Sequence, residues 1–356
     1  MAGLVVAPLK SIGLDEERAL ELLRLAALFH EIGHLPFSHG AEGVLPKEFR
    51  HEHISLAIAR SLEAEVDKWF WRGASQYLAL LIDPKPQNTP TEMLFLRDIL
   101  SGPIDADRCD YLLRDSLHCG VAYGQFDLNW LLETITLVDF EGVRIAINKR
   151  GIHTIEALIL ARYYMLSQVY YHRTRRLFDI YLLQFFQRKL SHLSTMKQDD
   201  LVSVVDLDDY CVMQMLRDAL VDEDTETRRL ADRLYHRGGN AGKHSMIWES
   251  GEFNGYFKVK VLLNKVKELQ ERLPSSHLII DCNDFKPIRI HEFYRRNDQD
   301  EGALFVVVDR DKPKLLTDES GVMERLPRHF WPVRVYAMGG EDDWPEIRCE
   351  LDSVEG

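Results

Sequence analysis

The chain has 356 residues, of which 46% are hydrophobic and 28% are charged, a composition typical of a globular protein with an ample core. No stretch approaches the roughly 20 uninterrupted apolar residues that span a bilayer, which excludes an integral membrane protein. The net charge of −13 disfavours a broad electrostatic grip on nucleic acid, so an anionic substrate would need a local basic cluster or a bound metal.

Two further features concern the cellular compartment. The N-terminal residues 1–9 are apolar but lack a preceding basic region and a clear cleavage site, so we expect no secretory signal. The five cysteines are scattered and show no CxxC spacing: Cys109, Cys119, Cys211, Cys282 and Cys349. This pattern argues against a disulfide framework or a cysteine zinc site, and it favours a reducing cytoplasm.

Helical periodicity dominates residues 14–190. Leu22, Leu25 and Phe29 recur at helical spacing, and Asp15 is a favourable N-cap for the helix that contains them. Further helices are predicted over residues 52–65, 75–83, 92–101, 107–117, 127–136, 154–190 and 209–236. One short strand pair is expected near residues 143–147.

The pattern changes towards the C-terminus. Residues 237–256 contain five glycines, which indicates a linker or an irregular loop. Residues 258–273 are typical of an amphipathic helix, and β-rich runs follow at residues 277–282, 303–308 and 333–338. The predicted organisation is an all-α main body, a linker and a small C-terminal α+β module, with boundaries at residues 1–240, 241–257 and 258–356.

A dense histidine cluster follows the first predicted helix. The sequence F-H-E-I-G-H-L-P-F-S-H-G-A-E begins at Phe29, and R-H-E-H occupies residues 50–53. Five of the 14 histidines and four carboxylates lie in this region: His30, His34, His39, His51, His53, Glu31, Glu42, Glu48 and Glu52. A lone histidine is usually structural, but this concentration at the end of an apolar helix favours a metal or proton-transfer site.

Residues 30–34 also match H-E-x-x-H, in which two histidines on one helix face bind zinc and the glutamate activates water. The longer protease motif needs glycine where this chain has Phe37, and its third histidine lies one residue beyond the position of His39. Pro36 opposes the continued helix that the short motif requires. We therefore regard a zinc protease as the weaker interpretation.

Two blocks carry a resemblance to a known superfamily. The first is A-L-F-H-E-I-G-H-L-P-F-S-H at residues 27–39, and the second is I-D-A-D-R-C-D-Y-L-L-R-D-S-L-H-C-G-V at residues 104–121. Together they resemble the HD superfamily of metal-dependent phosphohydrolases, in the branch of the dGTP and dNTP triphosphohydrolases that includes the SAM-and-HD-domain enzymes. The resemblance covers roughly residues 1–240, with a fainter extension into the C-terminal module, and it implies an HD-domain main body.

The resemblance implies a divalent metal (Mg, Mn, Fe, Co, Ni or Zn) held by His30, Glu31 and Asp107. In that superfamily a His-Asp doublet ends a helix, and a distant histidine before it and a distant aspartate after it complete the site. Glu31 replaces the expected aspartate, which moves the carboxylate by about a bond length and can change the metal preference. The preceding histidine, from an H-S-x-G type segment, has no counterpart in this sequence, so three of the four expected ligands are visible.

The resemblance also implies roles around the metal. The matching catalytic positions are His34, His39, Glu42 and His51. A histidine held by a carboxylate can pass a proton to a leaving oxygen, and His39 with Glu42 is the best candidate for that pair. His53 matches no position of the superfamily, and we expect it to be structural.

Substrate contacts are implied for two segments. Asp107, Tyr111 and Asp115 share one face of the second predicted block at helical spacing, so the tyrosine and the second aspartate can meet a sugar. The full implied set is Arg108, Tyr111, Asp115, His172 and Arg173. The plainer interpretation of residues 107–117 is an exposed helix with charge pairs such as Asp110 and Arg114.

The implied reaction is the hydrolysis of a dNTP to a deoxynucleoside and triphosphate, with water attacking the α-phosphorus. Two alternatives remain open: a phosphohydrolase that acts on another phosphate ester, and a degenerate HD protein that binds nucleotide without hydrolysing it. We further expect a cytoplasmic homo-oligomer with a nucleotide substrate, without membrane association and without strong nucleic-acid binding.

Overall fold

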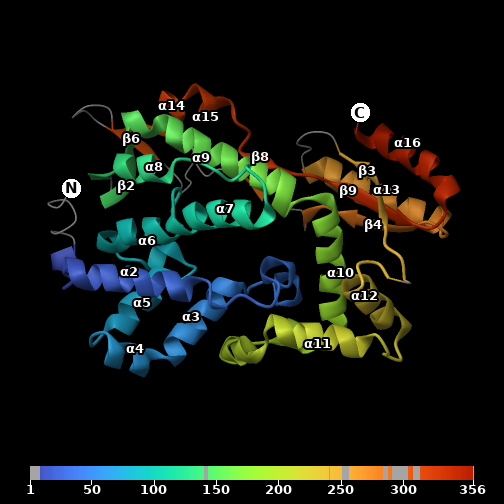
Figure 1. Cartoon of the computed structure of the whole chain (residues 1–356), viewed down its shortest axis with the longest axis horizontal. Coiled ribbons are helices and arrows are strands. Elements are labelled where there is room, and N and C mark those ends of the chain that lie inside the picture. The colour runs from blue at the N-terminus through green and yellow to red at the C-terminus, as the bar shows by residue number, and fades with distance from the viewer. Residues whose placement is uncertain are drawn as a thin grey trace. The chain divides into compact units, whose positions relative to one another are not determined.

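A computed structural model of the chain describes residues 9–139, 143–239, 241–250, 256–283, 288–290, 304–307 and 313–355. The chain divides into two compact units, which are described one at a time (Figure 1). Unit 1 consists of residues 1–165, 192–208 and 291–326. Unit 2 consists of residues 166–191, 209–290 and 327–356.

Unit 1 is built mainly from helices around one apolar core. Its longer helices are α2 (Glu16–His30), α3 (His51–Ser61), α4 (Glu63–Trp69), α5 (Ala74–Ile82), α6 (Leu94–Ser101), α7 (Ala106–Cys119), α8 (Leu128–Thr134) and α9 (Ile152–Met165). The helices α2, α3, α5 and α6 surround buried side chains such as Leu22, Leu78 and Leu96. The core therefore lies directly behind the helix whose end carries the first histidines.

Local sequence chemistry explains where the two helices of the candidate site begin. The Asp15 side chain accepts a hydrogen bond from the Arg18 amide at 2.8 Å, which caps α2. The Asp105 side chain accepts one from the Arg108 amide at 2.7 Å, which caps α7 in the same way. Gly120, with φ of 67°, ends α7 in the left-handed conformation that glycine adopts without strain.

A small sheet in unit 1 joins segments that are far apart in the sequence. Its strand order is β1 (Ile135–Asp139), β2 (Val143–Asn148), β6 (Phe305–Val307) and β7 (Lys314–Leu315). The pair β1–β2 is antiparallel and confirms the predicted strand pair, whereas β2 and β6 run parallel, with Ile147 opposite Val306. Arg144 of β2 makes a two-pronged ion pair with Asp98 of α6, at 2.7 and 3.0 Å, which ties the sheet to the helices.

Unit 2 combines helices with a three-stranded antiparallel sheet. Its helices are α10 (Arg173–Lys189), α11 (Asp209–Ala219), α12 (Thr225–Tyr235), α13 (Tyr256–Arg272) and α16 (Trp344–Glu355). The sheet has the order β3 (Ser245–Glu249), β9 (Arg334–Met338) and β4 (His277–Asp281), and β5 (Ile288–Arg289) pairs separately with β8 (His329–Phe330). Figure 1 shows α13 and α16 beside this sheet, and their apolar faces share its core.

The predicted fold class, a helical main body with a small α+β part, is confirmed. Three local expectations are corrected. Residues 209–236, predicted as one helix, form the two separate helices α11 and α12. The helix predicted over residues 154–190 is divided by a π-helical segment, Leu166–Tyr170. The predicted linker contains the strand β3, because its apolar residues pair with β9 in spite of the surrounding glycines; residues 251–255 of that linker lie outside the described residues.

The predicted domain boundaries, which divide the chain into consecutive segments, remain a prediction. Each of the two compact units, in contrast, is made of three separate segments of the chain. Residues 291–326, expected in the C-terminal module, fall in unit 1, and α14 (Leu316–Glu319) and α15 (Gly321–Arg325) lie there. Residues 303 and 308, the ends of one expected strand, lie outside the described residues. In the part of the chain that the structure describes, every helix is too short or too polar to cross a lipid bilayer.

Candidate active site

The first feature of the site is the end of α2 at His30. The helix ends with Glu31 as its C-cap, and the chain then turns through Phe37 and Ser38, whose φ values of 59° and 53° are left-handed. Such values are uncommon for non-glycine residues and hold the turn in a defined shape. Because His34 lies beyond the helix, it does not share a helix face with His30, and the geometry of the H-E-x-x-H protease motif is not formed.

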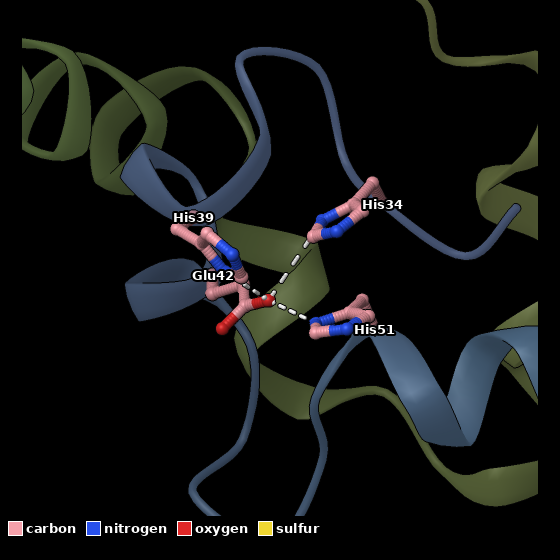
Figure 2. Close-up of side chains that lie close together, drawn as sticks. All are labelled: His34, His39, Glu42 and His51. Carbon is pink, nitrogen blue, oxygen red and sulfur yellow. Dashed lines mark hydrogen bonds and ion pairs between the residues drawn. The ribbon is translucent and has the colours of Figure 1, made fainter. Parts of the chain in front are cut away.

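Three histidine side chains beyond the helix converge on one carboxylate oxygen of Glu42 (Figure 2). The Oε1 atom of Glu42 lies 2.5 Å from Nδ1 of His51, 3.1 Å from Nδ1 of His39 and 4.0 Å from Nδ1 of His34. The rings of His34 and His51 stack with their centroids 4.0 Å apart. The structure therefore brings together all four residues that the sequence predicts as catalytic.

Hydrogen bonding sets the charge of Glu42 and His39. The hydrogen bond to Glu42 raises the pKa of His39. Burial alone would raise the pKa of Glu42, but the hydrogen bonds from His39 and His51 hold it well below its ordinary range. The pair is therefore suited to keep a proton on His39 and a negative charge on Glu42.

Glu31 links this cluster to the helix end. Its Oε1 atom accepts a hydrogen bond from Nδ1 of His30 at 2.6 Å, and its Oε2 atom accepts one from Nε2 of His34. Nε2 of His51 lies 4.0 Å from the same carboxylate. Although burial opposes ionisation, the two hydrogen bonds lower the pKa of Glu31 well below its ordinary range, so the side chain is a carboxylate.

Asp107 lies in the first turn of α7, and the charges of His30 and Glu31 act on its carboxyl group. Burial raises the pKa of Asp107, and the negative charge of Glu31 raises it further, whereas His30 opposes the rise. Among the residues that the structure describes, Asp107 has no hydrogen bond or ion pair of its own. The negative charges of Glu31 and Asp107 therefore repel each other, and the imidazole of His30 offsets part of this repulsion.

These residues fit a divalent cation. Carboxylate oxygens and an imidazole nitrogen are suitable ligands for Mg²⁺, Mn²⁺ and other first-row metals, and a cation beside Glu31 and Asp107 would remove their repulsion. Two buried polar atoms without a hydrogen-bond partner among the described residues belong instead to the surroundings of Glu42 and His51: Nδ1 of His34, 4.0 Å from Glu42, and Oε2 of Glu52, 3.6 Å from His51. We therefore expect His30, Glu31 and Asp107 to hold the metal.

The Glu42 group contains donors of the same kinds. One ligand atom from each of its four residues, His34, His39, Glu42 and His51, lies within 4.8 Å of the others. In this group, however, imidazole N–H groups already balance the charge of the carboxylate. Metal binding by His30, Glu31 and Asp107 and proton transfer by the Glu42 group both remain predictions.

The predicted substrate residues of α7 have different environments. Tyr111 is partly buried, and burial raises the pKa of its hydroxyl. Asp115 lies one turn further along the helix and is also partly buried. Arg108 donates to the Gly102 carbonyl and lies 3.1 Å from Asp105, so its guanidinium already has partners within unit 1.

The two predicted substrate residues on α10 belong to unit 2. The Nδ1 atom of His172 accepts a hydrogen bond from the Thr174 amide at 3.3 Å and so caps α10. Arg173 begins the helix, and its carbonyl accepts a hydrogen bond from the Tyr336 hydroxyl at 2.8 Å. The participation of His172 and Arg173 in the site remains a prediction.

His53, expected to be structural, has a structural contact. Its Nδ1 atom accepts a hydrogen bond from the Arg50 amide at 3.2 Å, which caps the first turn of α3. The bond stabilises the N-terminus of α3, where His51 is the first helical residue. His53 thus supports the site without being directed at it.

Sequence analysis missed Arg162 of α9. The positive charge of this partly buried residue acts on Asp105 and on Tyr111, so it lies close to the substrate face of α7. Burial raises the pKa of Asp105 to about 6, against the opposing charges of Arg108 and Arg162. An arginine near the end of a largely apolar stretch of α9 was the available signal for a cation near this face of α7.

Family models match both parts of the chain. Residues 5–115 match the HD domain, and residues 126–254 match an HD associated region. The first match contains the His30-Glu31 doublet and Asp107, and the second contains α9 and α10. The two matches together support a relationship of the chain to the HD superfamily.

Individual proteins are similar to parts or most of the chain. An uncharacterised protein of Methanocaldococcus jannaschii is 35% identical over 202 residues, 56% of this chain and 40% of the relative, so the match spans less than half of that protein. A deoxynucleoside triphosphate triphosphohydrolase SAMHD1 homologue of Dictyostelium discoideum is 27% identical over 180 residues, 48% of this chain and 34% of the relative. A crystal structure of a Bacteroides thetaiotaomicron phosphohydrolase has 21% identity and a TM-score of 0.63, covering 94% of this chain and 84% of that one, and it supports the fold.

The metal assignment predicts the behaviour of two aspartates on α7. Asp107→Ala is expected to weaken Mn²⁺ binding by at least about 10-fold, because it removes one of the three ligands. Asp110→Ala is the matched control: Asp110 lies on the same helix but is exposed and pairs with Arg114. Equilibrium Mn²⁺ titration measures both, and equal affinities in the two variants would contradict the assignment.

Proposed function

We propose that the chain is a metal-dependent nucleotide phosphohydrolase, with a dNTP as substrate and a deoxynucleoside and triphosphate as products. The observation that carries the proposal is the convergence of His34, His39 and His51 on Glu42, next to the hydrogen-bonded His30-Glu31 doublet, whose charges act on Asp107. The match to the HD domain and the similarity to the Dictyostelium triphosphohydrolase homologue support it, and the Bacteroides phosphohydrolase shares the fold.

The metal ligands are His30, Glu31 and Asp107 in this proposal. A divalent metal there supplies Lewis acidity, which polarises a phosphoryl oxygen and makes water a better nucleophile at neutral pH. The chain's own contribution is to fix the carboxylate of Glu31 by hydrogen bonds from two histidines. This arrangement positions the ligands before a substrate binds.

His39 is the proposed proton donor. Its side chain is 67% exposed, so a substrate can reach it, and its hydrogen bond to Glu42 is 3.1 Å long. Attack of water on the α-phosphorus breaks the bond to the 5′-oxygen, which takes the proton from His39. The attacking water releases a proton in the same cycle, so His39 can be reprotonated.

Positive charge and a sugar-binding face complete the proposed site. The positive charge of Arg162 acts on Tyr111 and would favour a phosphate oxygen near this face of α7. Tyr111 and Asp115 lie on one face of α7 and offer an aromatic ring and a carboxylate to the sugar. These local features offset the overall charge of −13.

An assay of purified chain with Mn²⁺ or Mg²⁺ tests the proposed function. The substrates are a panel of dNTPs and NTPs with a simple phosphomonoester and a phosphodiester for comparison. We expect triphosphate release from dNTPs, and a loss of at least about 100-fold in kcat/KM for Asp107→Ala but not for Asp110→Ala.

Other products point to the alternatives. If only the simple esters are hydrolysed, the substrate is another phosphate ester and not a dNTP. Nucleotide binding without turnover in metal-loaded protein would contradict the hydrolase and favour a degenerate HD protein. Residue 31 is a glutamate where the superfamily has an aspartate, and this difference is the observation that favours the degenerate HD protein.

The pH dependence of turnover tests the role of His39. Because the hydrogen bond to Glu42 raises its pKa, the protonated ring persists to higher pH and is lost as the pH rises through that raised value. In Glu42→Gln the proton is lost at lower pH, so the alkaline limb of the kcat profile shifts to lower pH. Glu48→Gln, an exposed carboxylate in the same loop, is the control, and a limb that stays in place in Glu42→Gln would rule out this role.

A further inference from the structure

A single buried hydroxyl connects the end of α2 to α3. The Oγ atom of Ser55 donates a hydrogen bond to the His30 carbonyl at 2.8 Å and accepts one from the Gly33 amide at 3.0 Å. Ser55 is fully buried, with 0% of its surface exposed. The two backbone groups that it binds lie on either side of Glu31.

The contact depends on the absence of a side chain at residue 33. A Cβ atom there would lie 2.2 Å from the His51 carbonyl oxygen and 2.4 Å from the Ser55 amide nitrogen. Both neighbours are backbone atoms of the first turn of α3, which cannot move aside cheaply. Glycine therefore lets the turn after the doublet lie directly against α3.

Ser55 and His51 lie one helical turn apart on the buried side of α3. The same contact that holds the backbone around Glu31 therefore also fixes the helix turn that presents His51. His51 in turn reaches Glu42 at 2.5 Å and lies 4.0 Å from Glu31. The two halves of the site are joined at this one point of α3.

We infer that Ser55, with Gly33, is a positioning residue of the active site: its hydroxyl fixes Glu31 for metal binding and sets the place of His51 relative to it. The inference rests on the proposed function for its effect on catalysis, but its effect on metal affinity does not require turnover. Ser55 touches neither metal nor substrate; it acts through the backbone of residues 30 and 33.

A buried serine elsewhere in unit 1 provides a matched control. Ser116 of α7 is 1% exposed, and its hydroxyl donates to the Val121 carbonyl at 2.6 Å, also just beyond a helix end. Ser55→Ala and Ser116→Ala therefore remove the same atom from similarly buried places and are both expected to lower the melting temperature. A structural role alone would give the two variants the same metal affinity and the same kinetics.

The experiment measures the Mn²⁺ dissociation constant, kcat and KM of both variants well below their melting temperatures. Ser55→Ala is expected to weaken Mn²⁺ binding and to lower kcat by about 10- to 100-fold with a smaller change in KM, as for other residues that orient metal ligands. Ser116→Ala is expected to keep wild-type values for all three. Equal Mn²⁺ affinities in the two variants would overturn the inference.

A second variant covers the case in which Ser55→Ala does not fold. Ser55→Cys nearly keeps the size of the side chain but forms weaker hydrogen bonds. We therefore expect its Mn²⁺ affinity to be lower than that of the wild type and, where Ser55→Ala folds, higher than that of Ser55→Ala. Wild-type Mn²⁺ affinity in folded Ser55→Cys would count against the inference. If the wild-type chain binds Mn²⁺ but hydrolyses no phosphate ester, the proposed function fails while the affinity comparison still decides the role of Ser55.

Discussion

The abrupt end of α2 at His30 is the constraint on which the rest of the site depends. A helix that continued would carry His34 around the same cylinder and away from Glu42. Instead the chain leaves the helix at Glu31 and folds back through two left-handed residues, so a single carboxylate can bind His30 on one side and His34 on the other. The close approach of Gly33 to α3 then brings in His51.

Charge within this small volume is arranged in two ways. Glu42 is surrounded by imidazole groups and is satisfied by them. Glu31 is hydrogen-bonded too, but it also faces Asp107, and burial and repulsion raise the pKa of that aspartate. Uncompensated negative charge in a partly buried place is costly unless a cation is bound, so the same electrostatics separates a proton-transfer group from a metal group.

Some of this arrangement was predictable from the sequence, and the physical reason differs from one part to the next. The resemblance to the HD superfamily and their closeness along the chain predicted His34, His39, Glu42 and His51 as one group, and helical spacing predicted the helix of Asp107. The pairing of β2 with β6 was not predictable, because local periodicity does not identify a distant partner strand. Ser55 was missed for a similar reason: a serine within a helix carries no sign of what lies against it.

The central claim is that His30, Glu31 and Asp107 form the metal centre of an HD phosphohydrolase. Anomalous X-ray diffraction from crystals of the chain grown with Mn²⁺ tests it most directly, because the signal locates the metal without reference to turnover. The account predicts a peak within coordination distance of all three side chains. A peak at the Glu42 group alone, or no peak at saturating Mn²⁺, would contradict it.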